Sequence, residues 1–424
     1  MTRLKIIITL LIFNLGVSAQ GDELSLSDAI SRAMENNFGI RISMAEKEIA
    51  GINNNPANAG RYPTVGFDLS ATNNYNIIDD IYASGLNAGV GIRWTVFDGF
   101  RISLTMDKLS HLEKLAEGRA AVVIENTIED VILGYYNVLL QQERLEVMGE
   151  VMSLSEDRYE YEQTREEYGN AVTFNVLQAR NNYLSDKAAY INQEVSYRNA
   201  VRNFDFIIGE DSNVNWTFTG DFKADTSAYV LADLLDRMVA DNTVLENQYI
   251  NIMLSKNATE LARSDFYPSL NVSAGIDNRN NMRPAASRES SLSAYANITL
   301  SYDIYQGGLR RRAVEVAKIN ESIAGIEEEE LQKGLTNQLL NLFDMYNVRK
   351  ELLYIAGESV EAAALNMQIA DEKLRAGAIN SFNYRDIQMI YLNAVYQQLQ
   401  DVYNLIATKA ALTRITGGFI NEGD

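Results

Sequence analysis

The sequence predicts a mixed α and β protein in which long coiled-coil helices make up most of the chain and four strands form a smaller part. Three observations predict this fold class. The two halves of the chain carry the same landmarks about 205 to 208 residues apart, each half has two segments in which apolar and polar residues alternate, and each half then runs for about 68 residues without proline. A period this long indicates a duplicated half and not a short solenoid repeat.

The landmarks keep their order in both halves. They pair Asn37 with Asn242, Tyr62-Pro63 with Tyr267-Pro268, Phe97-Asp98-Gly99 with Tyr305-Gln306-Gly307, Gly169 with Gly377, and Ile208-Gly209 with Thr416-Gly417. We therefore expect a first repeat at residues 20–209, a linker rich in Asp, Asn, Thr and Gly at 210–230, a second repeat at 231–417, and a tail at 418–424.

Residues 1–19 are expected to be an export signal peptide. Arg3 and Lys5 precede an apolar run from Ile6 to Val17, and Val17-Ser18-Ala19 has the small residues of a cleavage site. The alternative is a retained anchor, but the run is short for a membrane-spanning helix and Asn14 interrupts it. The chain has no Cys, so packing alone must hold the mature protein.

Charge and composition exclude several classes of function. Removal of the signal peptide leaves 35 basic and 57 acidic side chains, a formal charge of −22, which argues against a nucleic-acid partner and against binding through a basic membrane-facing surface. No other window holds the roughly 18 apolar residues of a transmembrane helix, so any crossing must use strands. With no Cys, one His at 111 and no phosphate-binding loop, we expect no enzyme, cofactor or metal site.

The first element is predicted to be a helix from Leu24 to about Ala59, with Ser27 able to cap its start. Tyr62-Pro63 ends it, because proline lacks an amide donor and disfavours helix before it.

Four segments then show the period of two that is typical of strands, at residues 65–72, 86–96, 270–277 and 292–304, with Asp79-Asp80 in the loop between the first two. The polar faces carry Asp68, Arg93, Asp277 and Asp303, which we expect to line a wet barrel lumen. Trp94 and Tyr302 lie on the apolar faces near strand ends, where aromatic side chains suit the level of lipid headgroups.

Four strands cannot close a transmembrane barrel, since known barrels begin at about eight strands and an open edge leaves backbone groups unpaired in lipid. Several chains must therefore share one barrel. The alternative is a soluble sandwich whose apolar faces are buried, in which the same polar residues are simply exposed to solvent.

Very long helices follow each pair of strands. The first extends from about Phe100 to Tyr168, which is roughly 100 Å at 1.5 Å per residue, and its apolar residues show coiled-coil spacing. Gly169 and Gly377 are predicted to end the long helices in the left-handed conformation, and Thr173 and Ser381 to begin the returning helices.

Taken in order, these motifs resemble the TolC-type outer membrane efflux proteins over nearly all of the mature chain. The resemblance rests on Leu26-Ser27-Asp28-Ala29-Ile30 with Asn36-Asn37, Arg61-Tyr62-Pro63, Phe97-Asp98-Gly99, Tyr135-Tyr136-Asn137-Val138-Leu139-Leu140, the Gly169 and Gly377 turns, Val176-Leu177-Gln178-Ala179-Arg180 and Tyr305-Gln306-Gly307-Gly308. It implies a homotrimer in outer membrane lipid, with a shared twelve-strand barrel, an α-helical periplasmic barrel and the linker at its equator. It also implies a passive export duct that docks to a periplasmic adaptor and an inner-membrane transporter.

The same resemblance implies site residues at the periplasmic tip. The tip turns Gly169, Asn170, Gly377 and Ala378 would meet the adaptor, and Asp386, Asn383, Asn175 and Gln178 would surround the aperture. The alternative for Asp386 is a solvated carboxylate favoured by the helix dipole. Ile379 stands where the best-described gate of the family has an arginine, so that salt-bridge lock does not transfer.

Two readings from other classes stay open at this point. One is a periplasmic coiled-coil scaffold or adaptor without a pore, which would not need strands with one lipid-compatible face. The other is an enzyme. The sequence does not indicate the cargo, nor whether the inner-membrane partner is a proton-driven pump or an ATPase.

Overall fold

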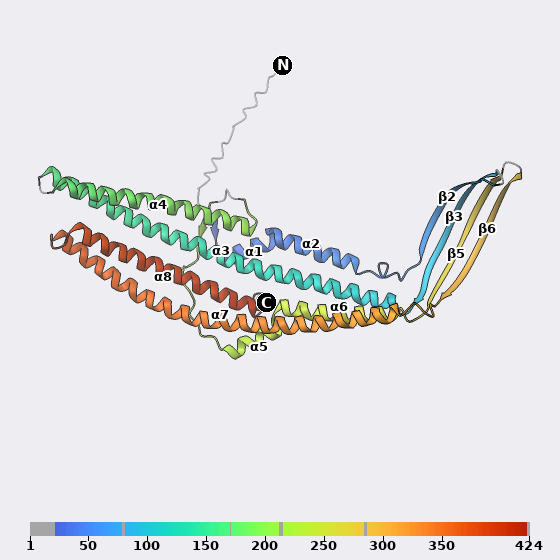
Figure 1. Cartoon of the computed structure of the whole chain (residues 1–424). Helices are drawn as coiled ribbons and strands as arrows, with labels where there is room; N and C mark the ends of the chain where they lie inside the picture. The colour runs from blue at the N-terminus through green and yellow to red at the C-terminus, as the bar shows by residue number, and fades with distance from the viewer. Residues whose placement is uncertain (1–21, 79–80, 170, 212–214, 284–285, 422–424) are drawn as a thin grey trace, which may run out of the picture.

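The structure is a computed structural model that describes residues 22–78, 81–169, 171–211, 215–283 and 286–421. The predicted signal peptide, the Asp79-Asp80 loop and Asn170 lie outside the described residues. The chain is long and curved, with a four-stranded sheet at one end and two helical hairpins at the other (Figure 1). Two helices of 67 residues each, α3 and α7, connect the ends.

The elements repeat in the order that the sequence predicts. The first repeat contains β1 (Asp22–Leu24), α1 (Leu26–Asn36), α2 (Phe38–Asn53), β2 (Thr64–Asn76), β3 (Ile81–Asp98), α3 (Arg101–Glu167) and α4 (Thr173–Ile208). The linker contains β4 (Trp216–Phe218), and the second repeat contains α5 (Leu231–Asp241), α6 (Thr243–Ser264), β5 (Ser269–Arg283), β6 (Ala286–Ser301), α7 (Leu309–Arg375) and α8 (Ser381–Ile415), followed by α9 (Gly418–Asn421). Among the described residues, no helix is both long and apolar enough to cross a membrane.

The single first helix that the sequence predicts is wrong. Leu24 belongs to β1, and Ser25 rather than Ser27 caps α1, through a capping box with Asp28. The helix then breaks at Asn37, which caps α2. The Asn37 side chain accepts the Ile40 N–H at 3.1 Å and donates to the Ile207 carbonyl at 2.7 Å. The break is therefore stabilised by a residue far away in sequence.

The long helices and their turns confirm the prediction closely. Gly169 and Gly377 have φ of +75° and +72°, a conformation that glycine adopts without a Cβ penalty. The helices α4 and α8 begin at Thr173 and Ser381, as expected. The N-cap of α8 is Asn380, whose side chain accepts the Asn383 N–H at 2.9 Å.

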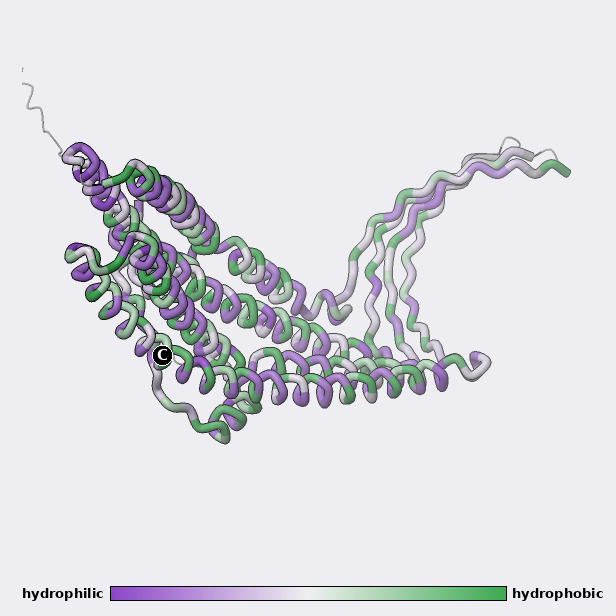
Figure 2. Tube along the Cα trace, turned by 60° about the vertical axis from the view of Figure 1, so that its left-hand side comes forward, coloured by the Kyte–Doolittle hydropathy of each residue, from purple (hydrophilic) through white to green (hydrophobic). Residues whose placement is uncertain are grey.

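The sheet has the strand order β2-β3-β5-β6, and all of its pairs are antiparallel. Its central pair, β3 with β5, joins the two repeats. The alternation of polar and apolar residues along the strands is visible in Figure 2. One face holds Val65, Phe67, Val90, Ile92, Ile276 and Ile298, and the opposite face holds Asp68, Arg93, Asp277 and Ser293.

The fourth strand is shorter than predicted. It ends at Ser301, so Tyr302 and Asp303 lie beyond the sheet. The Asp303 carboxylate accepts a hydrogen bond from Gln306 at 2.5 Å and pairs with Arg310 at 3.3 Å. These contacts belong to the turn that leads into α7, and the placement of Asp303 on a strand face is therefore wrong.

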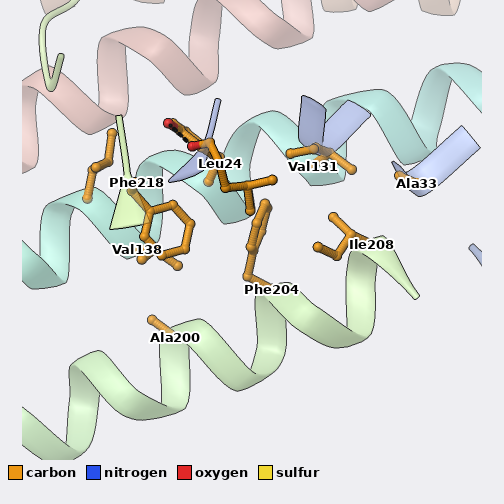
Figure 3. Packing of buried hydrophobic residues seen from close by; sticks show 11 residues of the cluster. Leu24, Ala33, Val131, Val138, Ala200, Phe204, Ile208 and Phe218 are labelled. Carbon is orange, nitrogen blue, oxygen red and sulfur yellow. Dashed lines mark hydrogen bonds between the residues drawn. The ribbon is translucent and has the colours of Figure 1, made fainter. Parts of the chain in front are cut away.

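Two buried clusters hold the middle of the molecule, one in each repeat. The first packs α1, α3 and α4 around Leu24, Val131, Phe204 and Ile208 (Figure 3). The second packs α5, α7 and α8 around Met238, Leu339, Leu405 and Leu412.

Each cluster includes a tyrosine that binds the linker or its neighbours. The Tyr135 hydroxyl donates to the Leu24 carbonyl at 3.1 Å and accepts the Gly220 N–H at 3.0 Å. The Tyr346 hydroxyl donates to the Ser227 carbonyl at 2.7 Å. The sequence alignment of the halves pairs Tyr135 with Phe343, so the second repeat provides its linker contact one helical turn later.

The packing order of the helices places different elements at the two edges of the chain. Near the sheet, α3 lies between α2 and α6, and α7 packs on the far side of α6. Near the tip, α3 lies between α4 and α8, and α7 packs on the far side of α8. One side of the chain is thus formed by β2, α2 and α4, and the other by β6 and α7.

Candidate functional site: the helical tip and the polar face of the sheet

The tip consists of the two turns that follow α3 and α7. A Cβ atom added at Gly169 or Gly377 would meet nothing within 4 Å, so only the left-handed backbone restricts these positions. The Gly377 and Ala378 N–H groups donate to the carbonyls of Leu374 and Lys373 at 3.0 and 2.8 Å, which closes the end of α7. Gly169, Gly377 and Ala378 therefore lie on an open surface.

An aromatic pair joins the two turns. The rings of Phe174 and Phe382 lie 6.2 Å apart and both side chains are exposed. The two residues are equivalent in the two repeats. Their contact brings the beginnings of α4 and α8 together, with Tyr168 and Val172 adding exposed apolar surface beside them.

The candidate aperture residues lie in the first turns of α4 and α8. Asp386 and Asn383 are exposed, and Asn175 and Gln178 are half-buried. Arg385 does not neutralise its neighbour Asp386, because its guanidinium contacts the Asp186 carboxylate through two bonds of 2.6 Å each.

The contact between Arg385 and Asp186 was not foreseen from the sequence. The Arg385 side chain also lines a small pocket between α3, α4 and α8, together with Ser155, Arg158, Tyr384 and Gln388. Burial raises the pKa of the Tyr384 hydroxyl. The sequence signal that could have indicated this contact is Arg385 itself, because the equivalent position of the first repeat holds the apolar residue Leu177.

The polar face of the sheet carries three of the predicted lumen residues. Asp68 and Arg93 lie 3.7 Å apart, and both side chains are more than 70% exposed (78% and 71%), so the pair adds little stability. The Asp277 carboxylate lies over Gly89, where an added Cβ would come within 2.1 Å of its Oδ1. The polar face of the sheet therefore carries several charged side chains.

Tyr295 also lies on the polar face, as the alternation predicts, but its packing over glycines was missed by sequence reasoning. Its hydroxyl would be 2.7 Å from a Cβ at Gly275 and 3.0 Å from one at Gly91, so the ring covers glycines of two neighbouring strands. The pairing of Gly91 with Gly275 in the sheet leaves the room for it. An aromatic ring over glycines stabilises a sheet where side chains are otherwise lacking.

The two candidate interface aromatics lie close to the helical end of the sheet. The Trp94 indole N–H donates to the Arg61 carbonyl at 3.1 Å. Tyr302 follows β6, and the Arg310 guanidinium lies 5.7 Å from its ring centre. Both rings are about half exposed.

Comparison with known families decides the identity of the fold. The sequence model of the family described as outer membrane efflux protein matches residues 29–210 and, a second time, residues 234–418. The chain belongs to the outer membrane efflux protein family. The two matches fall on the two repeats of this efflux protein.

Solved structures share the fold of the efflux protein. CusC has a TM-score of 0.78 at 14% identity, covering 94% of this chain and 93% of CusC. The CmeC outer membrane channel of Campylobacter jejuni has a TM-score of 0.76 at 14% identity, covering 93% and 85%. The open state of the Neisseria gonorrhoeae MtrE outer membrane channel has a TM-score of 0.72 at 15% identity, covering 93% and 89%. A search of curated protein sequences gives no significant match.

Family membership confirms the main functional prediction. The efflux protein is an outer membrane channel whose helical portion lies in the periplasm, and it is not a scaffold without a pore. The family consists of channel proteins rather than enzymes. Its members are trimeric and work with adaptors and inner-membrane pumps.

Proposed function

We propose that this efflux protein is the passive exit duct of a tripartite efflux or type I secretion system, and that three copies form one continuous channel. The observation that carries the proposal is the pair of unlike edges described above. A β6 edge on one copy fits a β2 edge on the next, and α7 of the same copy would then lie along α2 and α4 of the next. Unlike edges that meet head to tail form a ring when the rotation from copy to copy closes.

Exposed apolar stripes support this arrangement. On α7, Val316, Ile319, Ile323 and Ile326 are exposed and follow the 3-4-3 spacing of a helix-packing seam. On the opposite edge, α2 exposes Ile42, Ile49 and Ile52, and α4 exposes Leu177, Leu184 and Ile191. A soluble monomer would leave both stripes in water, whereas a ring covers them with each other.

The strand count supports the same assembly. Transmembrane barrels need about eight strands or more, and four strands per copy give twelve in a trimer. The polar face with Asp68, Arg93, Asp277 and Tyr295 then lines the lumen, and the apolar face meets lipid. The duct is proposed to open when a periplasmic adaptor and an inner-membrane transporter dock at the tip turns.

The electrostatics of the aperture provide the test of the duct. Three copies of Asp386 around the narrowest opening would attract cations, as rings of carboxylates do. We expect the trimer in a planar bilayer to be cation-selective, and Asp386→Asn to weaken both the selectivity and any block by divalent cations. The measurement is the reversal potential in a salt gradient.

Two further variants at the aperture make the result specific. Asp386→Glu keeps the charge and should keep the selectivity, and Asn383→Asp adds a second ring and should strengthen it. Trimer stability should change little, because an exposed carboxylate contributes little to folding. An unchanged reversal potential in Asp386→Asn would show that this side chain points away from the lumen.

The docking role of the tip gives a second prediction. Gly377→Val places a β-branched residue at φ +72° on an open surface, which distorts the turn without a steric clash. Export in cells should fall while the amount of trimer stays the same, because the tip is far from the sheet. Gly377→Asn is the matched control, since asparagine tolerates the left-handed conformation. Normal export by Gly377→Val at an equal amount of trimer would contradict the proposed docking role of the tip.

A further inference from the structure

The turn that leads from β6 into α7 gathers positive charge on an acidic chain. Residues 302–312, here called the α7 turn, hold three consecutive arginines, Arg310, Arg311 and Arg312, and one acidic residue, Asp303. The whole chain has a formal charge of −20. The α7 turn lies where the sheet meets the helices (Figure 1). In an outer membrane channel with a periplasmic helical portion, this is the level of the periplasmic leaflet.

Two of the three arginines have no acidic partner. The Arg310 guanidinium donates to the Asp303 carbonyl at 2.6 Å and pairs with the Asp303 carboxylate at 3.3 Å, and its side chain is only 13% exposed. Arg311 and Arg312 are exposed, and neither forms an ion pair with a carboxylate of the described residues. Arg312 donates to the Gly307 carbonyl at 2.8 Å, so its guanidinium points back along the turn toward the sheet. Two guanidinium groups are thus available to an anion at the membrane surface.

Helix stability does not explain the three arginines. They lie at the beginning of α7, where the helix dipole opposes positive charge. The first repeat does not need them, because the equivalent residues there are Ile102, Ser103 and Leu104. The helices that follow are equally long, since α3 and α7 each have 67 residues. The positive charge of the α7 turn therefore serves a partner outside the helix.

The neighbouring copy does not supply that partner, an argument that rests on the proposed head-to-tail ring. With β6 and α7 beside β2 and α2 of the next copy, the α7 turn faces residues 54–63, which connect α2 with β2. This segment holds no acidic residue, and its one charged residue is Arg61. The ring would therefore add positive charge beside the α7 turn.

Exposed apolar side chains lie in the same turn as the arginines. They are Tyr302, Ile304, Tyr305 and Leu309, of which Ile304 is 88% and Tyr305 is 85% exposed. The Arg310 guanidinium lies 5.7 Å from the centre of the Tyr302 ring. Aromatic and apolar side chains beside basic residues are typical of a segment at a membrane interface. A soluble anion would use the arginines but leave these side chains in water.

We propose that the α7 turn binds an anionic phospholipid of the periplasmic leaflet, with Arg311 and Arg312 on its phosphate and Ile304 and Leu309 against its acyl chains. Arginine can donate two parallel hydrogen bonds to one phosphate, and clustered basic residues near a membrane attract anionic lipid. The bound phosphate would offset the positive charge that the helix dipole opposes. The lipid therefore stabilises the junction of β6 with α7 once in every copy.

The test compares two phospholipids on the purified trimer in detergent. Native mass spectrometry counts how much phosphatidylglycerol and how much phosphatidylcholine of the same acyl chains the trimer retains after equal addition. Phosphatidylcholine carries the same phosphate together with a balancing positive charge. Wild type should retain several times more phosphatidylglycerol than phosphatidylcholine. The variant Arg311→Gln with Arg312→Gln should retain the two lipids equally, and it should fold because both side chains are exposed.

The matched control is Arg180→Gln with Arg202→Gln. It removes two exposed arginines of α4, far from the sheet, that likewise form no ion pair with the described residues. This control should keep the wild-type preference for phosphatidylglycerol. Loss of the preference in the control would overturn the proposal, because general attraction between the chain and anionic lipid would then suffice.

The temperature at which the trimer dissociates on a gel provides a second measurement. A ligand that binds the folded state stabilises it, so phosphatidylglycerol should raise this temperature more than phosphatidylcholine does. The two lipids should act alike on the Arg311 and Arg312 variant. Glycerol phosphate has the same phosphate but no acyl chains, and should not displace phosphatidylglycerol at equal concentration. Displacement would indicate a site for a soluble anion and would overturn the lipid site.

The outcomes separate the lipid site from the proposed duct. Equal retention of the two lipids by wild type, or an unchanged preference in the Arg311 and Arg312 variant, would overturn the lipid site and leave the duct intact. A wild-type chain that stays monomeric in both lipids would contradict the proposed ring. The preference of that monomer for phosphatidylglycerol would then decide on the lipid site by itself.

Discussion

Replacing Gly417 by alanine is expected to destabilise the efflux protein by about 2–5 kcal/mol, the sum of a left-handed backbone and a steric clash. Gly417 has φ +69°, and an added Cβ would lie 2.2 Å from the Asp241 carbonyl oxygen. The two nearest atoms belong to the Asp241 backbone, which cannot move away as the end of a flexible side chain could. The measurement is the temperature or denaturant concentration at which the helical signal of the detergent-solubilised protein is lost.

Gly377→Ala is the matched control for Gly417→Ala. Its φ is +72°, and an added Cβ meets nothing within 4 Å, so only the backbone cost of about 1–2 kcal/mol remains. Gly209→Ala should behave like Gly417→Ala, because a Cβ there would lie 2.5 Å from the Asn36 carbonyl oxygen. Equal losses of stability in Gly417→Ala and Gly377→Ala would show that Gly417 is packed less closely against Asp241 than described.

The second large effect is expected on the apolar face of the sheet. Leu292→Arg places a charge near the middle of β6 on the face that we assign to lipid, at a cost of about 2–4 kcal/mol. The folded trimer should form in lower yield, and its mobility on a gel should shift to that of monomer at a lower temperature than for wild type.

Ser293→Arg provides the control at the same depth in the same strand. Neighbouring residues of a strand point to opposite faces, so this arginine enters the polar lumen and should be tolerated. Should both variants assemble equally well, the assignment of the faces to lipid and lumen would be wrong.

The periodic parts of the fold could be predicted from the sequence. Alternation placed all four strands, and the absence of proline with a following glycine placed α3 and α7 almost to the residue. These features depend on local spacing and on the backbone conformation of single residues. The end of β6 could not be predicted from the alternation. Asp303 continues the alternating pattern, but its carboxylate bonds to Gln306 in the turn that follows.

The features that escaped prediction depend on partners distant in sequence. Asn37 interrupts a helical pattern because the Ile207 carbonyl lies within reach of its side chain. Local spacing gives no sign of the partner of Arg385, because Asp186 is nearly 200 residues away. At the candidate site, the sequence indicated the tip turns and the polar face, but not the pair that joins the two hairpins.

The order of strands in the sheet has a consequence for the way the protein matures after export. The first repeat alone contains only the hairpin of β2 and β3, and an isolated two-stranded hairpin is marginally stable at best. Its inner partner β5 is made only after the linker and α6 have followed. The apolar faces of β2 and β3 therefore stay exposed until the second repeat has also been exported. Contacts over such separations form slowly. The hairpin of β2 and β3 therefore depends most on periplasmic chaperones in the interval before β5 arrives.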